Sequence, residues 1–593
     1  MEENLTISQK RVSDVVDLER DVLPYRLIQL VAGVGAGKNY WVDQISRKQK
    51  ENGKSYNTLL ITSRAMTANA QANKMWANRF IDSENISRGS IGKVPPKKAV
   101  VTNSGIEQFL KKQYSPDDEK THIWNYLDFI ILDEAHSLAT DATFTDAPFY
   151  VHQFLRKAVH ENKNCHIIIM TGTPDPIDWL FPEELKDHQK YNHLNIFDKC
   201  THVEPQNVIL KSKIEVVSDI KDCLSKGYRV IYFARTIERI SELYDLLVRV
   251  GIDELSIGID YADESKSKDF SDETLQRREK IQKELKANEH LPDDIKVFIT
   301  TSKNKEGINI NNEDIKIMFA ESCQRAELIQ MAGRVRSSLE YFFIIYDSYN
   351  TSNFGKTSFE ATRDKNCLEM VNLALQDYEK ETERIMEHGD PLELRHRLYR
   401  NDIIQNIENT FPNIRYNPFT QAFMLYEGRI QGNYQMMKDT YSLIEYIENW
   451  DSPVYVAISK ENPPENKSSI DFFALEENET GEDQFKFWFP YSNIELWRCA
   501  DNPIISIHEA IKKLLIEKGC LDVKISKEQR ENLASDIRKI LPEYDYKKVE
   551  INPDFKQLGP LLKKVGFKIE DVGSHKTGKE KFKIRILEGW EGK

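Results

Sequence analysis

The chain has 593 residues, of which 40% are hydrophobic and 30% charged, and its formal net charge at pH 7 is −13. Domains usually hold about 100–200 residues, so we expect about three or four of them. The excess of acid excludes a protein that coats nucleic acid indiscriminately, although a local basic groove stays compatible with it.

The cysteines and the apolar runs of the sequence indicate the cellular compartment of the protein and whether it contacts a membrane. The seven cysteines are scattered singly without a CxxC pair, which predicts neither a zinc site nor a disulfide framework. No apolar run approaches the ~20 residues that span a bilayer, and MEENLTISQK lacks the apolar segment of a signal peptide. We therefore expect a cytoplasmic chain without a membrane partner.

From about residue 25 to 350, short apolar runs alternate with longer polar segments typical of helices. Continuous apolar strands between helices indicate parallel sheets that are covered on both faces. Their number predicts two α/β units in tandem. The runs are RLIQLVA (26–32), TLLIT (58–62), AVVTN (99–103), LDFIILD (127–133), HIIIM (166–170), YRVIYFA (228–234), IKVFITT (295–301) and YFFIIYD (341–347).

The pattern changes elsewhere in the chain. Residues 263–290 are nearly all polar and predict an exposed helical insertion in the second unit. Beyond residue 355 the sequence predicts long helices, then a β-rich segment, and finally three helices followed by two strands. The predicted domains are 1–205, 206–354, 355–450, 451–500 and 501–593.

A glycine-rich turn after the first apolar run fits the pattern [AG]-x4-G-K of a phosphate-binding loop. It follows a buried strand and opens a helix, which is the context that this interpretation requires. Glycines let successive N–H groups point at one anion, and Lys38 can reach the outer phosphates of a nucleotide. A glycine-rich turn without a ligand is the alternative. The candidate nucleotide-binding residues are Ala32, Gly33, Val34, Gly35, Ala36, Gly37, Lys38 and Asn39.

Two adjacent carboxylates, Asp133 and Glu134, end the apolar run FIIL. Ligands bind at the carboxyl ends of strands in open parallel sheets. Asp133 is the candidate ligand of Mg²⁺, together with Asn39, which stands where Ser or Thr usually holds the ion. Glu134 is the candidate that orients and deprotonates the attacking water. Solvated acids at a strand end are the alternative.

These motifs resemble those of superfamily 2 helicases of the DEAH-box type, in which two RecA-like domains clamp ATP. The resemblance covers about residues 25–350 and keeps the order of the family's motifs. LLITSRAMTANAQ resembles motif Ia, VVTNSGIEQF motif Ib, MTGTP motif III, IYFARTIERI motif IV, FITTSKNKEGINI motif V and QMAGRVRSS motif VI. The form G-R-V-R-S also resembles the origin-binding replication helicases of large DNA viruses, plasmids and phages.

The resemblance implies catalytic roles for Gln330, Arg334 and Arg336 in motif VI. An arginine that reaches the nucleotide from the second domain is worth ~10³–10⁵ in rate. The family pattern Q-x-x-G-R-x-x-R places its second arginine at Ser337 here. Arg336 lies one residue before this position, which on a helix turns its side chain by roughly 100°. Arg334 is therefore the preferred residue for this role.

Further roles follow from the same resemblance. Motif V implies a nucleotide contact at Gly307, and Asn309 replaces the common Asp of that motif. His136 is implied to bridge to Gln330 and to sense the nucleotide state, and a surface histidine that closes a strand end is the alternative. Thr171 and Thr173 of motif III are implied to couple hydrolysis to strand movement.

Nucleic-acid contacts are expected at strand ends, where Ser, Thr, Arg and backbone amides position phosphates without reading sequence. For each of these side chains a helix cap or a turn is the alternative. The candidates by motif position are Thr62, Arg64, Thr102, Arg235, Thr236 and Thr301.

The last part of the chain is locally basic. Residues 556–585 hold nine Lys or Arg against three acids, and LGPLLKKVGF followed by a basic hairpin resembles a winged-helix domain. A structural or protein-docking module is the alternative. The candidate DNA contacts are Lys563, Lys564, Lys568, Lys576 and Lys579.

Together the motifs predict an α/β protein with two tandem RecA-like domains that binds ATP and Mg²⁺. The expected activity is that of a DNA helicase or translocase in replication or related DNA processing. The alternatives are an RNA helicase, a nucleotide-switched protein that binds an origin or a partner, and the motor subunit of an anti-phage defence complex. A protein partner could bind the C-terminal region.

Overall fold

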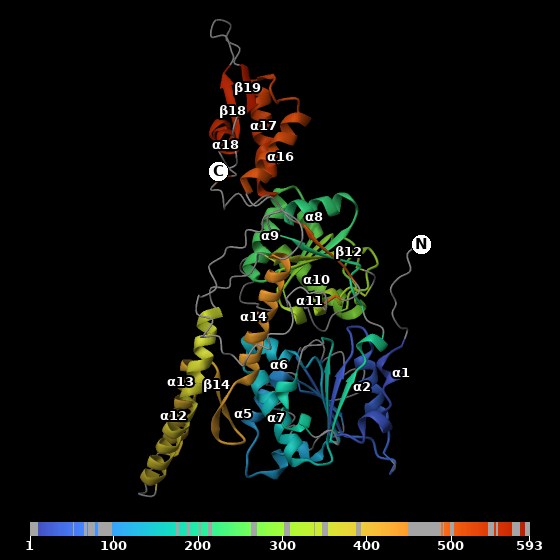
Figure 1. Ribbon diagram of the computed structural model, residues 1–593, viewed down its shortest axis with the longest axis vertical. Coiled ribbons are helices and arrows are strands. Elements are labelled where there is room, and N and C mark those ends of the chain that lie inside the picture. The colour runs from blue at the N-terminus through green and yellow to red at the C-terminus, as the bar shows by residue number, and fades with distance from the viewer. Residues whose placement is uncertain are drawn as a thin grey trace.

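Two large sheets dominate the computed structural model (Figure 1). No helix among the described residues is both long and apolar enough to cross a membrane. The described residues are 10–50, 52–63, 68, 78–80, 98–173, 177–186, 190–200, 203–211, 216–261, 270–301, 309–336, 339–346, 354–386, 393–448, 488–489, 492–497, 503–543, 551–552, 556–571 and 581–587.

The first sheet has seven strands in the order β3-β4-β2-β5-β6-β1-β7, and every pairing is parallel. Helices α5 (Asn103–Lys112) and α7 (Ala147–Glu161) cover one face, and α1 (Val12–Val15) and α2 (Lys38–Arg47) cover the other. Most residues of the central strands are buried and apolar because helices cover both faces of the sheet. The strands are β1 (Leu27–Val31), β2 (Thr58–Thr62), β3 (Asn78–Phe80), β4 (Lys98–Thr102), β5 (Phe129–Leu132), β6 (His166–Thr171) and β7 (Tyr191–Asn195).

The second sheet also has seven parallel strands, in the order β10-β11-β9-β12-β13-β8-β16. Helices α8 (Val216–Ser225) and α9 (Ile237–Arg249) pack on one face, and α10 (Asp272–Asn288) and α11 (Arg325–Ala332) on the other. The prediction of two tandem α/β units is confirmed. The strands are β8 (Asn207–Lys211), β9 (Arg229–Phe233), β10 (Ile257–Asp260), β11 (Val297–Thr300), β12 (Ile315–Ala320), β13 (Tyr341–Ile345) and β16 (Asn493–Trp497).

The interpretation of residues 263–290 as an exposed insertion is wrong for the part that the structure describes. Helix α10 connects β10 to β11 and buries a stripe formed by Thr274, Arg278, Ile281 and Leu285. Only two of these four side chains are apolar. The stripe escaped a search for hydrophobic periodicity because Thr and Arg occupy its first half.

Strand β16 lies in the segment 451–500, for which the sequence predicts a separate β-rich accessory region. The structure pairs it parallel to β8, so it forms the edge of the second sheet. Trp488 and Phe489, from the same segment, are buried in the core of this unit. Residues 451–487 lie outside the described part of the chain. The division of the chain into five domains stays a prediction.

The accessory region after the second unit begins with two long helices, α12 (Phe354–Met386) and α13 (Glu393–Thr410), which lie side by side as an arm (Figure 1). An antiparallel pair, β14 (Ile414–Asn417) and β15 (Ala422–Leu425), packs on α12 through Leu375 and Phe423. Helix α14 (Glu427–Glu448) then returns towards the two sheets.

The C-terminal unit has its own small core. Its elements are α16 (Pro503–Glu517), β17 (Lys524–Ser526), α17 (Lys527–Ile540), α18 (Leu558–Lys564), β18 (Phe567–Asp571) and β19 (Lys581–Ile586). The three strands form an antiparallel sheet in the order β17-β19-β18. Lys221 of α8 forms an ion pair with Glu543, which attaches this unit to the second sheet domain.

Candidate nucleotide site between the two sheet domains

The glycine-rich turn joins β1 to α2, and Lys38 is the first residue of that helix. Gly35 and Gly37 have φ values of +90° and +83°, a region that favours glycine. The buried ammonium of Lys38 donates hydrogen bonds to the carbonyl oxygens of Ala32 (3.0 Å) and Gly33 (3.3 Å). The loop thus has the geometry of a phosphate cradle, with its cation folded back onto the backbone.

Asn39 and Asp133 provide the oxygen atoms that the sequence assigns to a metal. The side-chain oxygen of Asn39 is buried and meets no hydrogen-bond donor within the described part of the chain. Asp133 is 3% exposed, and its Oδ1 accepts a hydrogen bond from the backbone N–H of Glu134 (3.1 Å). A buried carboxylate and an unpaired amide oxygen are donor types that suit Mg²⁺. Among the described residues no cluster of three His, Cys, Asp or Glu side chains could hold a metal alone.

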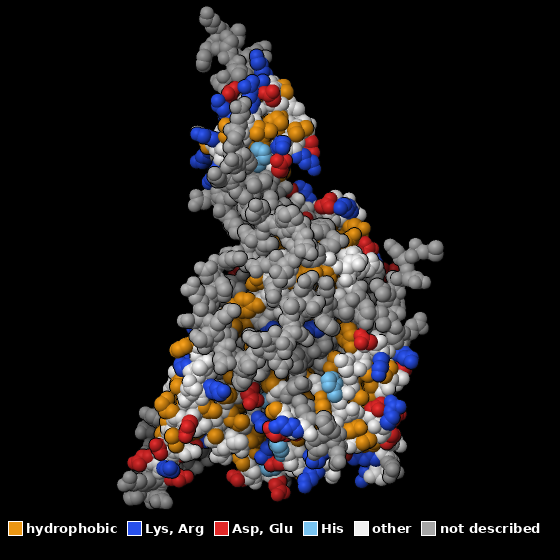
Figure 2. Space-filling view, in the orientation of Figure 1, with side chains coloured by type: hydrophobic (Ala, Val, Ile, Leu, Met, Phe, Trp, Pro, Cys, Tyr) orange, Lys and Arg blue, Asp and Glu red, His pale blue; other side chains and the backbone are white. Residues whose placement is uncertain are grey.

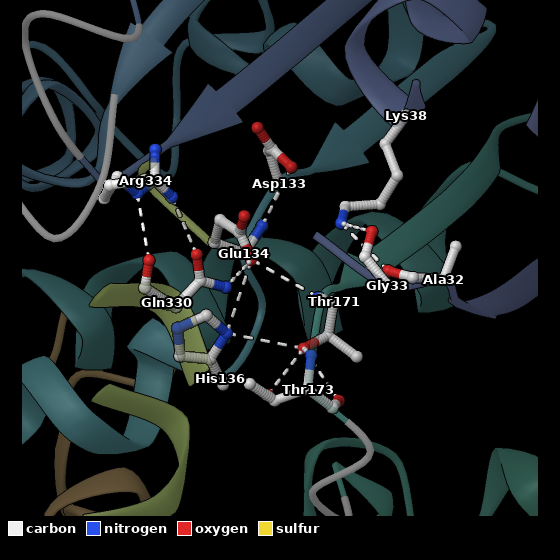
Figure 3. A network of polar contacts seen from close by, with 11 residues as sticks. Ala32, Gly33, Lys38, Asp133, Glu134, His136, Thr171, Thr173, Gln330 and Arg334 are labelled. Atoms are coloured by element: carbon white, nitrogen blue, oxygen red, sulfur yellow. Dashed lines mark hydrogen bonds and ion pairs between the residues drawn. The ribbon is translucent and has the colours of Figure 1, made fainter. Parts of the chain in front are cut away.

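Glu134 is the residue on which both sheet domains converge. Its φ is +52°, which is uncommon for a residue with a side chain and typical of functional sites. Its Oε2 accepts hydrogen bonds from Nε2 of Gln330 (3.0 Å) and from the backbone N–H of Gly172 (3.4 Å). Nδ1 of His136 lies 3.5 Å from the same oxygen (Figure 3).

His136 also lies close to the strand β6 motif. Its Nδ1 is 3.3 Å from the hydroxyl oxygen of Thr171. This hydroxyl donates to the carbonyl oxygen of Thr173 and accepts from the N–H of Thr173, both at 3.1 Å. The structure therefore brings together the three residues that the sequence names for coupling (Figure 3).

Arg334 is bound to Gln330 by two hydrogen bonds. Its Nε donates to the Gln330 carbonyl oxygen (3.1 Å), and its Nη2 donates to Oε1 of the Gln330 side chain (2.8 Å). Because Oε1 is engaged, the amide nitrogen of Gln330 is turned towards Glu134. Figure 3 shows Arg334 on the Gln330 side of Glu134, with Lys38 on the opposite side.

Arg336 lies over the glycine-rich loop. Its Nε and Nη2 donate to Oδ1 of Asn309 at 2.9 and 2.7 Å. Its Nη1 is buried without a hydrogen-bond partner in the described residues, and a Cβ built on Gly35 would lie 3.1 Å from it. Burial, followed by the charge of Arg334, lowers the pKa of Arg336 to about 10. The structure thus places Arg336, and not the preferred Arg334, next to the glycine-rich loop, while the catalytic role of either arginine stays a prediction.

Two glycines let the sheet domains approach closely, and the sequence-based reasoning missed both. A Cβ on Gly172 would lie 3.1 Å from Nε2 of Gln330 and 3.2 Å from Nζ of Lys38. A Cβ on Gly333 would lie 2.5 Å from Cγ1 of Val34. Their place inside the motifs TGTP and AGR was the available signal. Asn309 was noted as a departure, but its contact with Arg336 could not be read from the sequence.

The candidate nucleic-acid residues share one edge of each sheet. Thr62 and Thr102 are register partners at the ends of β2 and β4, and both are buried. Thr102 and Thr236 accept hydrogen bonds from backbone N–H groups as caps of α5 and α9, as the alternative interpretation predicts. Arg235 follows β9 and Thr301 follows β11. Arg64, Gly307, Ser337, Lys576 and Lys579 lie outside the described residues.

One protein-family model matches the N-terminal part of the chain. Residues 6–176 match the family "Type III restriction enzyme, res subunit" (ResIII). No curated protein matches the chain.

Several solved structures are similar to this chain. Mss116p bound to ssRNA and AMP-PNP is 16% identical over 55% of this chain and 69% of that chain, with a TM-score of 0.41. For S. cerevisiae Dbp5 bound to RNA and ADP BeF3 the identity is 14%, the coverages are 54% and 80%, and the TM-score is 0.39. Mycobacterium smegmatis helicase Lhr bound to ssDNA and AMP-PNP is 14% identical, with coverages of 72% of this chain and 58% of that chain and a TM-score of 0.37. The ResIII match is thus confined to residues 6–176, the part of the chain that holds the glycine-rich loop, Asp133 and Glu134.

Proposed function

We propose that the protein is an ATP-driven helicase or translocase of the DEAH-box type that acts on DNA. The observation that carries the proposal is the convergence on Glu134, which contacts Gly172 of the first sheet domain and Gln330 of the second. A site of this kind senses whether the two domains are closed, because its groups come from both sides.

The phosphates of ATP bind at Ala32–Asn39 in this proposal. Lys38 exchanges the loop carbonyls for phosphate oxygens, and the helix N-terminus of α2 adds a favourable dipole. Asp133 and Asn39 would hold Mg²⁺, which would supply positive charge that offsets the charge of the phosphates.

Hydrolysis is assigned to the groups around Glu134. Its carboxylate orients the attacking water and accepts a proton from it, and Gln330 holds the carboxylate in place. Arg336 directs its unpaired Nη1 at the phosphate loop and stabilises charge on the transferred group. Arg334 is a positioning residue in this scheme because two of its hydrogen bonds hold Gln330.

DNA is the proposed substrate because of the C-terminal unit. Its elements follow the order helix, strand, helix, helix, strand, strand, with a three-stranded antiparallel sheet, which is typical of a winged helix. Helix α18 would be the recognition helix, and Lys563 and Lys564 in its last turn are exposed. Figure 2 shows basic side chains on this unit at the top of the view, beside acidic ones. Replication or related DNA processing is the proposed context.

ATP turnover with a panel of nucleic acids tests the proposal. We expect single-stranded or forked DNA to stimulate hydrolysis more than RNA, and Lys38→Ala to abolish the stimulated rate. Greater stimulation by RNA would favour an RNA helicase. Tight duplex binding without stimulated hydrolysis would favour a nucleotide-switched binding protein and reject the motor. Activity that appears only with other gene products would favour a subunit of a defence complex.

Closure of the cleft depends on Gly333, and we expect Gly333→Ala to lower kcat for ATP hydrolysis at least tenfold. The backbone of Gly333 (φ −73°) accepts alanine, so the effect comes from the added Cβ, 2.5 Å from Val34. Overpacking of this kind costs about 1–3 kcal/mol. The second substitution Val34→Ala removes Cγ1 at 2.5 Å and Cγ2 at 3.3 Å but keeps Cβ at 2.8 Å, so it should restore part of the activity. A double variant as slow as Gly333→Ala would contradict this account.

Contact of α18 with the DNA backbone predicts a change in salt dependence. Joint replacement of Lys563 and Lys564 by alanine should reduce the slope of log affinity against log salt by about two, since each phosphate contact contributes about 0.9. Lys512→Ala on α16, which removes an ion pair with Glu509, is the matched control. An unchanged slope in the double variant would assign the basic face to protein docking or to solvent.

A further inference from the structure

Helix α14 belongs to the accessory region, yet it contacts both sheet domains. Its first half packs on α6 (Ser137–Thr140), the short helix that follows Glu134 and His136 in the chain. Its last turns place Leu443, Tyr446 and Ile447 in the core of the second domain. Figure 1 shows α14 running from α6 to the second domain. One helix thus contacts both of the sheet domains that contribute residues to the candidate nucleotide site.

Two glycines form the contact of α14 with the first domain. A Cβ on Gly428 would lie 2.4 Å from the carbonyl oxygen of Leu138, and one on Gly432 would lie 2.1 Å from that of Ala139. Neither carbonyl can yield cheaply, because both are backbone atoms of α6. Arg429, between the two glycines, donates to the carbonyl oxygen of Thr143 (3.3 Å). The sequence therefore permits a helix-to-helix approach that any larger side chain would prevent.

Asp439 forms the contact of α14 with the start of α11, the helix that carries Gln330. The N-cap residue of α11, Gln324, makes no side-chain cap. Oδ2 of Asp439 instead accepts a hydrogen bond from the first helical N–H, that of Arg325 (2.9 Å), and the residue is 4% exposed. A carboxylate at this end of a helix is stabilised by the helix dipole. Gln435, one turn earlier in α14, donates to the other carboxylate oxygen (2.7 Å).

These two contacts lie about 10 Å apart along α14, at 1.5 Å per residue between Gly432 and Asp439. One end holds the helix that follows Glu134, and the other caps the helix that carries Gln330. Nε2 of Gln330, from the second sheet domain, lies 3.0 Å from Oε2 of Glu134, from the first. A change in the seating of α14 at either end therefore moves one of these two side chains relative to the other.

We propose that α14 is a strut that sets the separation of Glu134 and Gln330, with Gly428, Gly432 and Asp439 as positioning residues for ATP hydrolysis. The inference rests on the proposed function and adds to it that the accessory region is part of the catalytic apparatus.

The test compares two helical glycine-to-alanine substitutions. Gly432→Ala should lower kcat at least tenfold and leave the Kd of a fluorescent ATP analogue within about threefold of the wild-type value. Gly355→Ala on α12, where the added Cβ meets nothing within 4 Å, is the matched control and should behave as wild type. Wild-type kcat in Gly432→Ala would overturn the proposal.

Two substitutions of Asp439 test the contact of α14 with α11. Asp439→Ala should lower kcat, whereas Asp439→Asn, whose amide oxygen can still accept from Arg325, should retain more of it. Equal activities of these two variants would remove Asp439 from the proposal. A lower melting temperature with unchanged kcat at a permissive temperature would reduce α14 to a structural element.

Hydrogen exchange separates this inference from the proposed function. In Gly432→Ala, amides of α6 should exchange at least tenfold faster, while those of β5 and β12 in the two sheets stay protected. This outcome does not depend on any hydrolysis. If the wild-type chain proved inactive on every nucleic acid, faster exchange confined to α6 would still support the strut. Unchanged exchange in α6 would reject it.

Discussion

Arg336→Ala is expected to lower kcat for nucleic-acid-stimulated ATP hydrolysis about 10³-fold or more, with a smaller effect on nucleotide binding. An arginine that reaches the transferred phosphoryl group across a domain interface contributes about 10³–10⁵ in rate. Arg336 has the required geometry, since Asn309 fixes two of its nitrogens and the third faces Gly35. Single-turnover hydrolysis with saturating ATP measures the chemical step.

Two further variants make this result specific. Arg334→Ala should cause a smaller loss, because Arg334 acts through Gln330 and the Gln330–Glu134 contact can partly form without it. Arg249→Ala, at the exposed end of α9 in the same domain, should leave hydrolysis unchanged. If Arg334→Ala caused the larger loss and Arg336→Ala stayed active, the assignment of the two arginines would have to be exchanged.

The preference for Arg334 drawn from the sequence rested on a helix that does not extend so far. Rotation by about 100° per residue applies only where the helix continues, and α11 ends at Ala332. Val335 then forms a parallel bridge with Ile310, and the N–H of Arg336 donates to the carbonyl oxygen of Ile310 (3.0 Å). Arg336 is therefore aimed by an extended backbone, which no helical period predicts.

Features that depend on local chain geometry were accessible from the sequence. The glycines at positive φ and the lysine at the start of α2 follow from the spacing of one short motif. The position of Asp133 and Glu134 follows from the end of an apolar strand. Glu134 at φ +52° was not predictable, because nothing in a Glu side chain indicates a left-handed backbone.

Features that depend on distant partners were not accessible. β16 joins β8 across most of the second domain and the whole accessory region. From the sequence, the two glycines of α14 would only be expected to destabilise the helix. Their role in the close approach to α6 follows from the contact itself. The sequence does not distinguish Asp439 from the other acidic residues. Its role as a cap follows only from its contact with α11, whose own N-cap residue makes no side-chain cap. In each case the deciding contact joins residues that no periodicity relates.

Glu134→Gln is the second large effect that we expect, a loss of about 10²–10⁴ in kcat, the usual contribution of a general base. The substitution keeps the size of the side chain and one acceptor oxygen for Nε2 of Gln330 and the N–H of Gly172. It removes the ability to take a proton from water. ATP binding, measured with a fluorescent analogue, should therefore stay near the wild-type value while turnover is lost.

The combination of intact binding with lost turnover identifies the role of this carboxylate. A residue that only held the cleft closed would, when changed, weaken nucleotide binding together with hydrolysis. Glu107→Gln on α5, which breaks an exposed ion pair with Lys111, is the matched control and should leave both unchanged. Because the strained backbone of Glu134 is retained in Glu134→Gln, the comparison isolates the chemistry of the side chain from the geometry of the turn. Wild-type turnover in Glu134→Gln would show that another group acts as the base. Glu134 would then only connect the two domains through its hydrogen bonds.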